Sequence, residues 1–225
     1  PGAGCAPAGV PAPQAEPERV IDFRPGKIIG VGKNYRAHAA ELDSGVPPEP
    51  LLFFKAPSAV IGNGQPFPRP PEFERVDYEG EIGLVIGKRG RRISAADAMD
   101  HVLGFVCVND FTIRDLQRKD SQWARAKGFD GSCAVGPRIV AGIAVDELQV
   151  STRIGDEVRQ SAPASQMVWS IPAIIEFASQ YMTLEEGDLI ATGTPAGVGN
   201  LSPGDVVEVE IPGVGVLRNP VEEAP

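Results

Sequence analysis

Long apolar runs, clustered basic residues and paired cysteines are all missing from this sequence. No stretch approaches the roughly 20 apolar residues that a membrane-spanning helix needs, and the first residues show neither the basic nor the apolar region of a signal peptide. The formal net charge of −9 argues against nucleic acid or an anionic membrane as a partner. Three scattered cysteines indicate neither a disulfide framework nor a zinc site, so we expect a cytoplasmic protein.

Composition separates two regions of the chain. Residues 1–20 contain five prolines and no hydrophobic period, which is typical of a linker or tail. Residues 21–225 are expected to form a single domain, because this length can bury a substantial core.

Short apolar or alternating runs bounded by glycine and proline predict a strand-rich domain. We expect strands at residues 27–32, 51–55, 78–86, 102–110, 149–154, 157–160, 189–192, 206–211 and 214–217. Helices are expected at 34–42, 94–99, 114–123 and 171–181, the last with Ser170 as cap and Pro172 in its first turn. The strands do not alternate with long helices, so we predict an α+β roll or barrel rather than a doubly wound parallel sheet.

The acidic run at residues 77–86 is the most informative stretch. If it forms a strand, Glu79 and Glu81 share the face opposite its apolar side chains, roughly 7 Å apart at the Cα atoms. Two such carboxylates repel each other unless a positive charge lies between them, and a hard divalent cation would satisfy both. An exposed acidic face is the alternative, and this segment alone does not decide between the two.

Asp110, at the end of the apolar run 102–110, favours the metal hypothesis. Arg114 and Gln117 follow at a spacing that places polar groups along one helical face. A carboxylate, a guanidinium and an amide pointing the same way indicate one metal ligand and two anion-binding groups. Three carboxylates without cysteine or histidine ligands favour Mg²⁺ or Mn²⁺ over zinc.

His38 and Glu41 form a candidate acid–base pair. They are separated by three residues, so on a helix they face the same way, and Glu41 could orient the imidazole and raise its basicity. A surface histidine is the alternative interpretation.

Two weaker signals lie further along the chain. Lys127 stands at a glycine turn, where it could reach a substrate carbonyl, although a lone lysine is usually a solvated surface residue. The glycine-rich stretch 191–199 lacks the pattern of a nucleotide-binding loop. Its backbone amides and hydroxyls, those of Gly193 and Thr194 among them, could still bind a carboxylate.

In this order the segments resemble the fumarylacetoacetate hydrolase family. The resemblance covers about residues 30–220 and rests on GKNYRAHAAE at 32–41, YEGE at 78–81, VNDFTIRDLQ at 108–117, KGFD at 127–130 and ATGTPAGVG at 191–199. The founding member carries a further acidic ligand seven residues before its catalytic histidine, where this chain has Val31. The chain is therefore similar to the short-form branch of acylpyruvate hydrolases, oxaloacetate decarboxylases and 2-hydroxyhepta-2,4-diene-1,7-dioate isomerases.

The resemblance implies a mixed β-sandwich roll, a homodimer, and a Mg²⁺ or Mn²⁺ site in a catalytic domain. The family's metal ligands correspond to three carboxylates, Glu79, Glu81 and Asp110. Its water-activating pair corresponds to His38 and Glu41. The positions that hold substrate oxygens correspond to Arg114, Gln117, Lys127 and Thr194, beside Gly193.

The expected substrate is a small 2-oxo or 2,4-dioxo acid. Its carboxylate and adjacent carbonyl would chelate the cation, which stabilises the enolate formed in C–C hydrolysis or decarboxylation. In a hydrolase, water activated by His38 and Glu41 attacks the distal carbonyl, and Lys127 polarises it. One alternative is an isomerase or decarboxylase of 2-hydroxymuconate-type diacids in aromatic catabolism, which extra basic residues in the pocket would favour. A non-catalytic metal-binding relative is the other.

Overall fold

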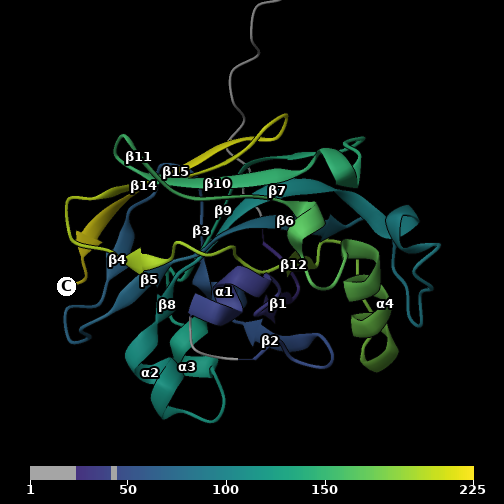
Figure 1. The fold of residues 1–225 in the computed structure, drawn as a ribbon, viewed down its shortest axis with the longest axis horizontal. Coiled ribbons are helices and arrows are strands. Elements are labelled where there is room, and N and C mark those ends of the chain that lie inside the picture. The colour runs from purple at the N-terminus through teal and green to yellow at the C-terminus, as the bar shows by residue number, and fades with distance from the viewer. Residues whose placement is uncertain (1–23, 42–44) are drawn as a thin grey trace, which may run out of the picture.

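The computed structural model describes residues 24–41 and 45–225. The predicted tail at 1–20 and the predicted start of the domain at residue 21 lie outside this part of the chain. Two curved sheets pack face to face, and the helices lie below and beside them (Figure 1). Within the described residues, no helix is long and apolar enough to cross a membrane.

A seven-stranded mixed sheet forms the centre of the molecule. Its strands run in the order β2 (Leu51–Lys55), β1 (Ile28–Gly32), β12 (Leu189–Ala191), β6 (Gly80–Ile86), β7 (Val102–Asp110), β9 (Cys133–Val140) and β3 (Val60–Ile61). The pairs β1–β12 and β3–β9 are parallel and the others are antiparallel. Strand β6 is buried throughout, as its nearly unbroken apolar sequence from residue 82 predicts for a strand covered on both faces.

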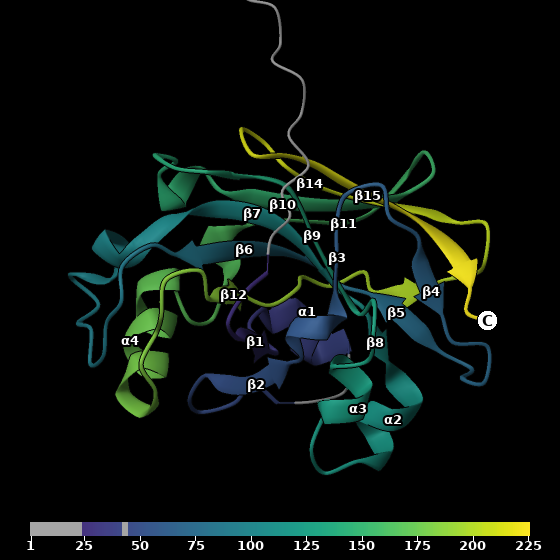
Figure 2. The ribbon, with the colours of Figure 1, turned by 180° about the vertical axis from the view of Figure 1, so that it is seen from behind.

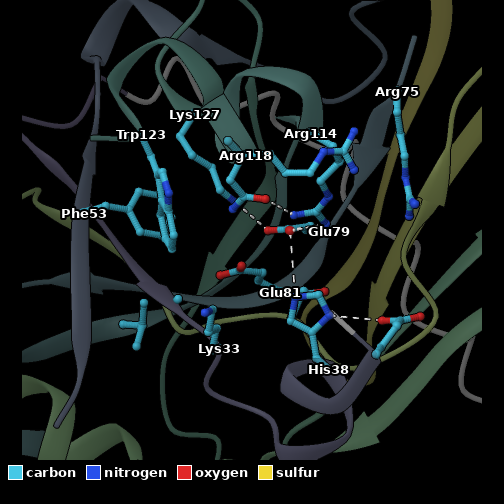
Figure 3. A pocket seen from close by; sticks show the side chains of 15 residues that line it. Lys33, His38, Phe53, Arg75, Glu79, Glu81, Arg114, Arg118, Trp123 and Lys127 are labelled. Atoms are coloured by element: carbon cyan, nitrogen blue, oxygen red, sulfur yellow. Dashed lines mark hydrogen bonds and ion pairs between the residues drawn. The ribbon is translucent and has the colours of Figure 1, made fainter. Parts of the chain in front are cut away.

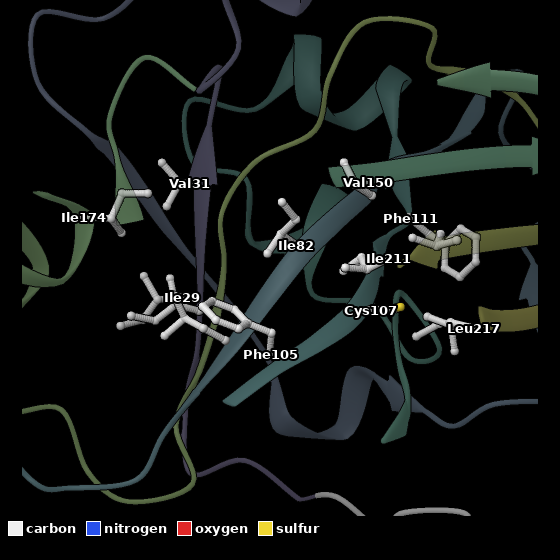
Figure 4. Packing of buried hydrophobic residues seen from close by; sticks show 14 of the residues in the cluster. Ile29, Val31, Ile82, Phe105, Cys107, Phe111, Val150, Ile174, Ile211 and Leu217 are labelled. Carbon is white, nitrogen blue, oxygen red and sulfur yellow. The ribbon is translucent and has the colours of Figure 1, made fainter. Parts of the chain in front are cut away.

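A five-stranded sheet covers one face of the central sheet. Its order is β11 (Glu157–Pro163), β10 (Gln149–Ile154), β14 (Val206–Ile211), β15 (Gly215–Glu223) and β4 (Phe67–Arg69). Burial alternates along β14, so Val207, Val209 and Ile211 point inward. They pack in one core with side chains of the central sheet that include Ile82 and Cys107 (Figure 4).

The helices are short, as predicted. They are α1 (Arg36–Glu41), α2 (Arg114–Lys119), α3 (Ala124–Lys127) and α4 (Ile171–Tyr181), with 3-10 turns η1 (Pro57–Ala59), η2 (Ala98–His101), η3 (Val145–Glu147) and η4 (Ala164–Gln166). Helix α4 has the predicted bounds, and the Ser170 hydroxyl accepts a hydrogen bond from the Ala173 amide. From behind, α2 and α3 lie together at the end of the molecule opposite α4 (Figure 2).

Three helix predictions differ from the structure. The helix predicted at 34–42 begins at Arg36. The helix predicted at 114–123 ends at Lys119, and α3 follows as a separate turn. The helix predicted at 94–99 is replaced by the 3-10 turn η2, because Ser94 bonds the Asp97 carboxylate and amide and so holds a local turn.

The strand predicted at 78–86 is interrupted at Glu79. Tyr78 ends β5 (Val76–Tyr78) and pairs with β13 (Gly199–Asn200) in a small third sheet completed by β8 (Thr112–Ile113), whereas Gly80 begins β6 and pairs with Asn109. The chain thus passes from one sheet to another at Glu79. Gly80 is needed there, since a Cβ atom would lie 1.9 Å from the Thr152 hydroxyl oxygen.

Candidate active site

A cavity of about 420 Å³ opens beside this crossing point (Figure 3). Eight of the ten residues predicted for the site line it, namely His38, Glu41, Glu79, Glu81, Arg114, Gln117, Lys127 and Thr194. Asp110 and Gly193 do not line the cavity but bond residues that do. The structure therefore brings together side chains from α1, the β5–β6 crossing, β7, α2, α3 and the glycine-rich loop.

Glu79, Glu81 and Asp110 form a buried acidic cluster. Each offers one carboxylate oxygen, and these three atoms lie within 4.8 Å of one another. The carboxylates come together because β6 and β7 are neighbouring antiparallel strands whose ends meet beside the crossing point. Glu79 is held from both sides, since its amide donates to the Asn109 side chain at 2.9 Å and its carbonyl accepts from the Asp110 amide at 2.9 Å.

Three cations compensate two of the three carboxylates. The Lys127 ammonium donates to Glu79 at 2.6 Å and to Asp110 at 2.7 Å. Arg114 donates to the other Glu79 oxygen at 2.6 Å. The buried ammonium of Lys55 donates to Asp110 at 2.5 Å and also to the Lys127 carbonyl.

These contacts shift the pKa values of Glu79 and Lys127. Burial alone would raise the pKa of Glu79, but the charges of Lys127 and Arg114 hold it well below its usual range. Burial alone would lower the pKa of Lys127, yet Asp110 and Glu79 raise it above the ordinary lysine value. The ammonium and the Glu79 carboxylate are thus both charged at neutral pH.

Glu81 differs from the other two carboxylates in its partners. Its carboxylate accepts a 2.7 Å hydrogen bond from the Gly193 amide, and no cationic side chain in the described part of the chain forms an ion pair with it. Burial, followed by the charges of Asp110 and Glu79, raises its pKa well above the usual range. A buried carboxylate beside two others, all with oxygen donors, fits a hard divalent cation such as Mg²⁺ or Mn²⁺.

The buried carboxylate of Asp77 orients Arg114. Asp77, fully buried, accepts from Arg114 Nε at 2.7 Å and from two nitrogens of Arg75 at 2.8 and 2.9 Å. Arg114 also donates to the Gln117 side-chain oxygen at 2.7 Å, the contact that their spacing on one helical face predicts. The guanidinium is thereby fixed between Asp77, Glu79 and Gln117.

His38 faces the acidic cluster and is 3% exposed. Its Nδ1 lies 3.1 Å from Glu41, and its Nε2 lies 4.0 Å from a Glu79 oxygen. The other Glu41 oxygen accepts from the Gly197 amide at 3.0 Å, which holds the carboxylate in place. The Glu41 carboxylate can only accept a hydrogen bond, so in a neutral His38 the proton is on Nδ1. The lone pair is then on Nε2, on the side of Glu79.

The glycine-rich loop contacts the protein rather than presenting an open anion-binding turn. The Gly193 amide is bonded to Glu81, and the Thr194 hydroxyl donates to the Gly80 carbonyl at 2.9 Å and accepts from Gln160 at 2.7 Å. Gly193 has φ +100°, and a Cβ there would lie 2.7 Å from that of Asn34. The loop therefore helps to hold Glu81 and the preceding Gly80 in position.

Several residues of the site were missed by sequence reasoning. Lys55 ends a predicted strand, and an isolated lysine there gave no signal of its contact with Asp110. Phe53 and Trp123 form an aromatic wall with ring centroids 5.5 Å apart, and the Lys127 ammonium lies 5.0 Å from the Phe53 centroid. Alternation along residues 51–55 could have placed Phe53 and Lys55 on the same face.

Residues 27–222 match the family described as fumarylacetoacetate (FAA) hydrolase, C-terminal. The chain is 45% identical over 212 residues to the oxaloacetate tautomerase YisK of Bacillus subtilis, which covers 88% of this chain and 70% of that protein. The crystal structure of 2-hydroxyhepta-2,4-diene-1,7-dioate isomerase from Mycobacterium marinum superposes with a TM-score of 0.83 at 41% identity, covering 89% of this chain and 76% of that one. A fumarylacetoacetate hydrolase structure from Exiguobacterium antarcticum gives 0.82 at 40% identity, with 89% and 76% covered.

Proposed function

The chain belongs to the fumarylacetoacetate hydrolase family, and we propose that it is a divalent-metal-dependent enzyme that interconverts keto and enol forms of a small 2-oxo acid. The sequence favoured C–C hydrolysis or decarboxylation and kept isomerisation as an alternative. The oxaloacetate tautomerase and the dioate isomerase among the relatives support that alternative.

One observation carries the proposal. Glu81, a buried carboxylate that forms no ion pair within the described residues, lies in a cluster with Glu79 and Asp110 and near a histidine that a second carboxylate orients. The Mg²⁺ or Mn²⁺ that these three residues would hold supplies a positive charge that favours enolisation of a bound 2-oxo acid.

The remaining steps belong to the side chains around the cluster. Arg114, fixed by Asp77, can hold the substrate carboxylate together with the Gln117 amide. His38 Nε2, on the side of Glu79, would remove the proton from C3 of the keto acid and return it to the oxygen at C2, so the reaction consumes no proton overall. Glu41 stabilises the imidazolium between these steps. Phe53 and Trp123, which line the cavity, would restrict the access of water to the bound substrate.

The metal assignment is tested by Glu81→Gln, which removes the charge and keeps the shape. We expect Mg²⁺ to bind at least tenfold more weakly by calorimetry and oxaloacetate tautomerisation, followed by enol absorbance, to be lost. Glu72→Gln, on an exposed residue outside the cavity, is the matched control. Wild-type Mg²⁺ affinity and turnover in the Glu81 variant would exclude the cluster as the metal site.

The histidine is tested separately by His38→Ala. Loss of a positioned general base lowers the rate by about 100- to 10,000-fold. Mg²⁺ binding should persist, since His38 Nε2 lies 4.0 Å from the Glu79 carboxylate, beyond hydrogen-bonding distance, and is not among the proposed ligands. Tautomerisation at the wild-type rate in this variant would show that another group moves the proton.

C–C hydrolysis is the second candidate. It is favoured by the same His38–Glu41 pair, which could activate a water molecule, and by Lys127, whose ammonium could polarise a distal carbonyl. Assays of acetylpyruvate and oxaloacetate on one preparation separate the two functions. Cleavage of acetylpyruvate with no effect on the oxaloacetate enol would establish the hydrolase instead.

A further inference from the structure

The backbone of Lys33 is strained at the edge of the cavity. In the described residues, only Lys33 (φ +57°) and Arg92 (φ +54°) combine a side chain with positive φ. This left-handed region is uncommon for residues other than glycine, asparagine and aspartate. Such strain persists where the surrounding structure imposes it, and it is frequent at functional sites.

Asn34 imposes this conformation on Lys33. Its side chain donates to the carbonyls of Trp169 at 3.1 Å and Thr192 at 2.8 Å and accepts from the Trp169 amide at 2.8 Å. Its own carbonyl accepts from the Val168 amide at 2.7 Å. The chain must therefore turn sharply between β1 and this anchor, and Lys33 is the residue that makes the turn.

The turn places Lys33 in the wall of the cavity. Figure 3 shows it beside Glu81 and His38, on the side of the cavity opposite Lys127 and Arg114. The neighbouring glycines leave room for the aromatic wall, since a Cβ at Gly32 would lie 3.0 Å from the Trp123 ring. A substrate whose first carboxylate is bound at Arg114 would extend past His38 toward Lys33.

Lys33 differs from the other basic residues of the cavity in its partners. Arg75 and Arg114 are paired with Asp77, Arg118 with Asp115, and Lys127 with Glu79 and Asp110. Lys33 has no acidic partner in the part of the chain that the structure describes. It is half-buried and lines the cavity, so its ammonium is available to an anion bound there.

We propose that Lys33 binds the second carboxylate of a 2-oxo dicarboxylic acid and so selects diacids over monoacids of the same skeleton. This inference rests on the proposed function, because the first carboxylate is assumed to lie at Arg114. The strain at Lys33 is retained because a glycine, which would adopt this backbone freely, carries no charge.

The test compares oxaloacetate with its 4-methyl ester, which has the same 2-oxo acid end and no second charge. Dissociation constants from thermal shift and kcat/KM from enol absorbance are measured on the Mg²⁺-loaded full chain. We expect the wild type to prefer the diacid by at least tenfold. Lys33→Met should lower that preference about tenfold, mainly through KM for the diacid, and Lys33→Arg should restore most of it.

Lys33→Gly separates a binding role from a structural one. Its melting temperature should be higher than that of the wild type, because the strain is relieved. It should nevertheless lose the diacid preference, as Lys33→Met does, and a loss that accompanies higher stability cannot come from a damaged fold. Arg92→Gly is the matched control: it relieves the same strain on an exposed residue and should leave the diacid preference unchanged.

The outcomes separate this inference from the proposed function. A wild type without diacid preference, or a Lys33→Met variant that keeps it, overturns the role of Lys33. If the wild type binds the diacid more tightly and Lys33→Met abolishes this, but neither compound is turned over, the role of Lys33 holds and the tautomerase proposal fails.

Discussion

The Lys127 ammonium lies 2.6 Å from Glu79 and 2.7 Å from Asp110, bonded to two of the three carboxylates proposed to bind the cation. A lysine at this place stabilises the cluster when no metal is bound. The same ammonium would repel a divalent cation held by these carboxylates. Lys127 therefore sets a balance between the stability of the metal-free protein and its affinity for metal.

Lys127→Met should shift that balance in both directions. Removing one partner of a buried ion pair costs about 3–5 kcal/mol, so the metal-free variant should unfold at lower denaturant concentration. Mg²⁺ should bind more tightly, because a competing positive charge is gone. Lys119→Met, on an exposed residue of α2, is the control. Unchanged or weaker Mg²⁺ binding in calorimetry would refute the competition.

Asp77→Asn should impair the substrate-binding guanidinium. Asp77 holds Arg114 and Arg75 but belongs to neither the proposed metal ligands nor the cavity lining. Loss of such an orienting carboxylate lowers activity by about 10- to 100-fold. We expect this loss in kcat/KM with little change in Mg²⁺ affinity, whereas Asp120→Asn, which alters only a surface pair with Arg125, should behave as wild type. Equal activity of both variants would contradict the role of Asp77.

The raised pKa of Glu81 predicts a pH-dependent effect of metal on stability. Because folding raises this pKa, the metal-free protein gains stability from a protonated Glu81 at low pH. It loses that contribution as pH rises through the raised pKa. Bound metal replaces the proton, so the increase in melting temperature on adding Mg²⁺ should grow over the same pH range. The lowered pKa of Glu79 has the opposite effect on stability: its ionised carboxylate stabilises the fold, and this contribution is lost only when the pH falls below the ordinary carboxyl range.

Melting curves at a series of pH values, with and without Mg²⁺, measure this effect. Glu81→Gln should abolish the pH dependence of the Mg²⁺ shift, because glutamine does not titrate. A shift that stays constant with pH in the wild type would mean that Glu81 is ionised without metal.

Gly80→Ala should destabilise the fold at the crossing point. The added methyl group would overlap the Thr152 hydroxyl, and such overpacking costs about 1–3 kcal/mol. Gly62→Ala is the control, since the nearest atom would lie at an ordinary 3.6 Å, on the Gln65 side chain. Urea denaturation of the two variants measures the difference, and equal midpoints would show that the sheets can separate to admit a methyl group.

Local patterns predicted the parts of the fold that depend on neighbours in sequence. Ser170 and Pro172 marked the start of α4, and the apolar run before Asp110 marked β7. The likeness of the motif order to a known family brought the candidate site residues together before the structure showed them in one place. Glu79 and Glu81 were predicted on one face of an unbroken strand, whereas the structure interrupts that strand at Glu79 and brings one oxygen of each residue within 4.8 Å of the other.

The missed features depend on contacts between distant segments. The break at Glu79 follows from Tyr78 pairing with Gly199 and Gly80 with Asn109, which no local period reveals. The burial of Lys127 and Lys55 depends on carboxylates 17 and 55 residues away from them. A lysine among polar neighbours resembles a surface residue until its partner is known.

The passage of the chain between sheets at Glu79 links metal affinity to the packing of the whole domain. Glu79 precedes β6 directly, Glu81 lies within it, and Asp110 ends β7, the neighbouring strand of the same sheet, so the spacing of the three oxygens is set by the pairing of β6 with β7 and by the crossing at Glu79. A substitution in the core that shifts β6 against β7, or β5 against β6, would separate the ligands without touching them. Metal affinity therefore reports on the alignment of these strands, and a bound cation would hold the crossing point at Glu79 against the central sheet.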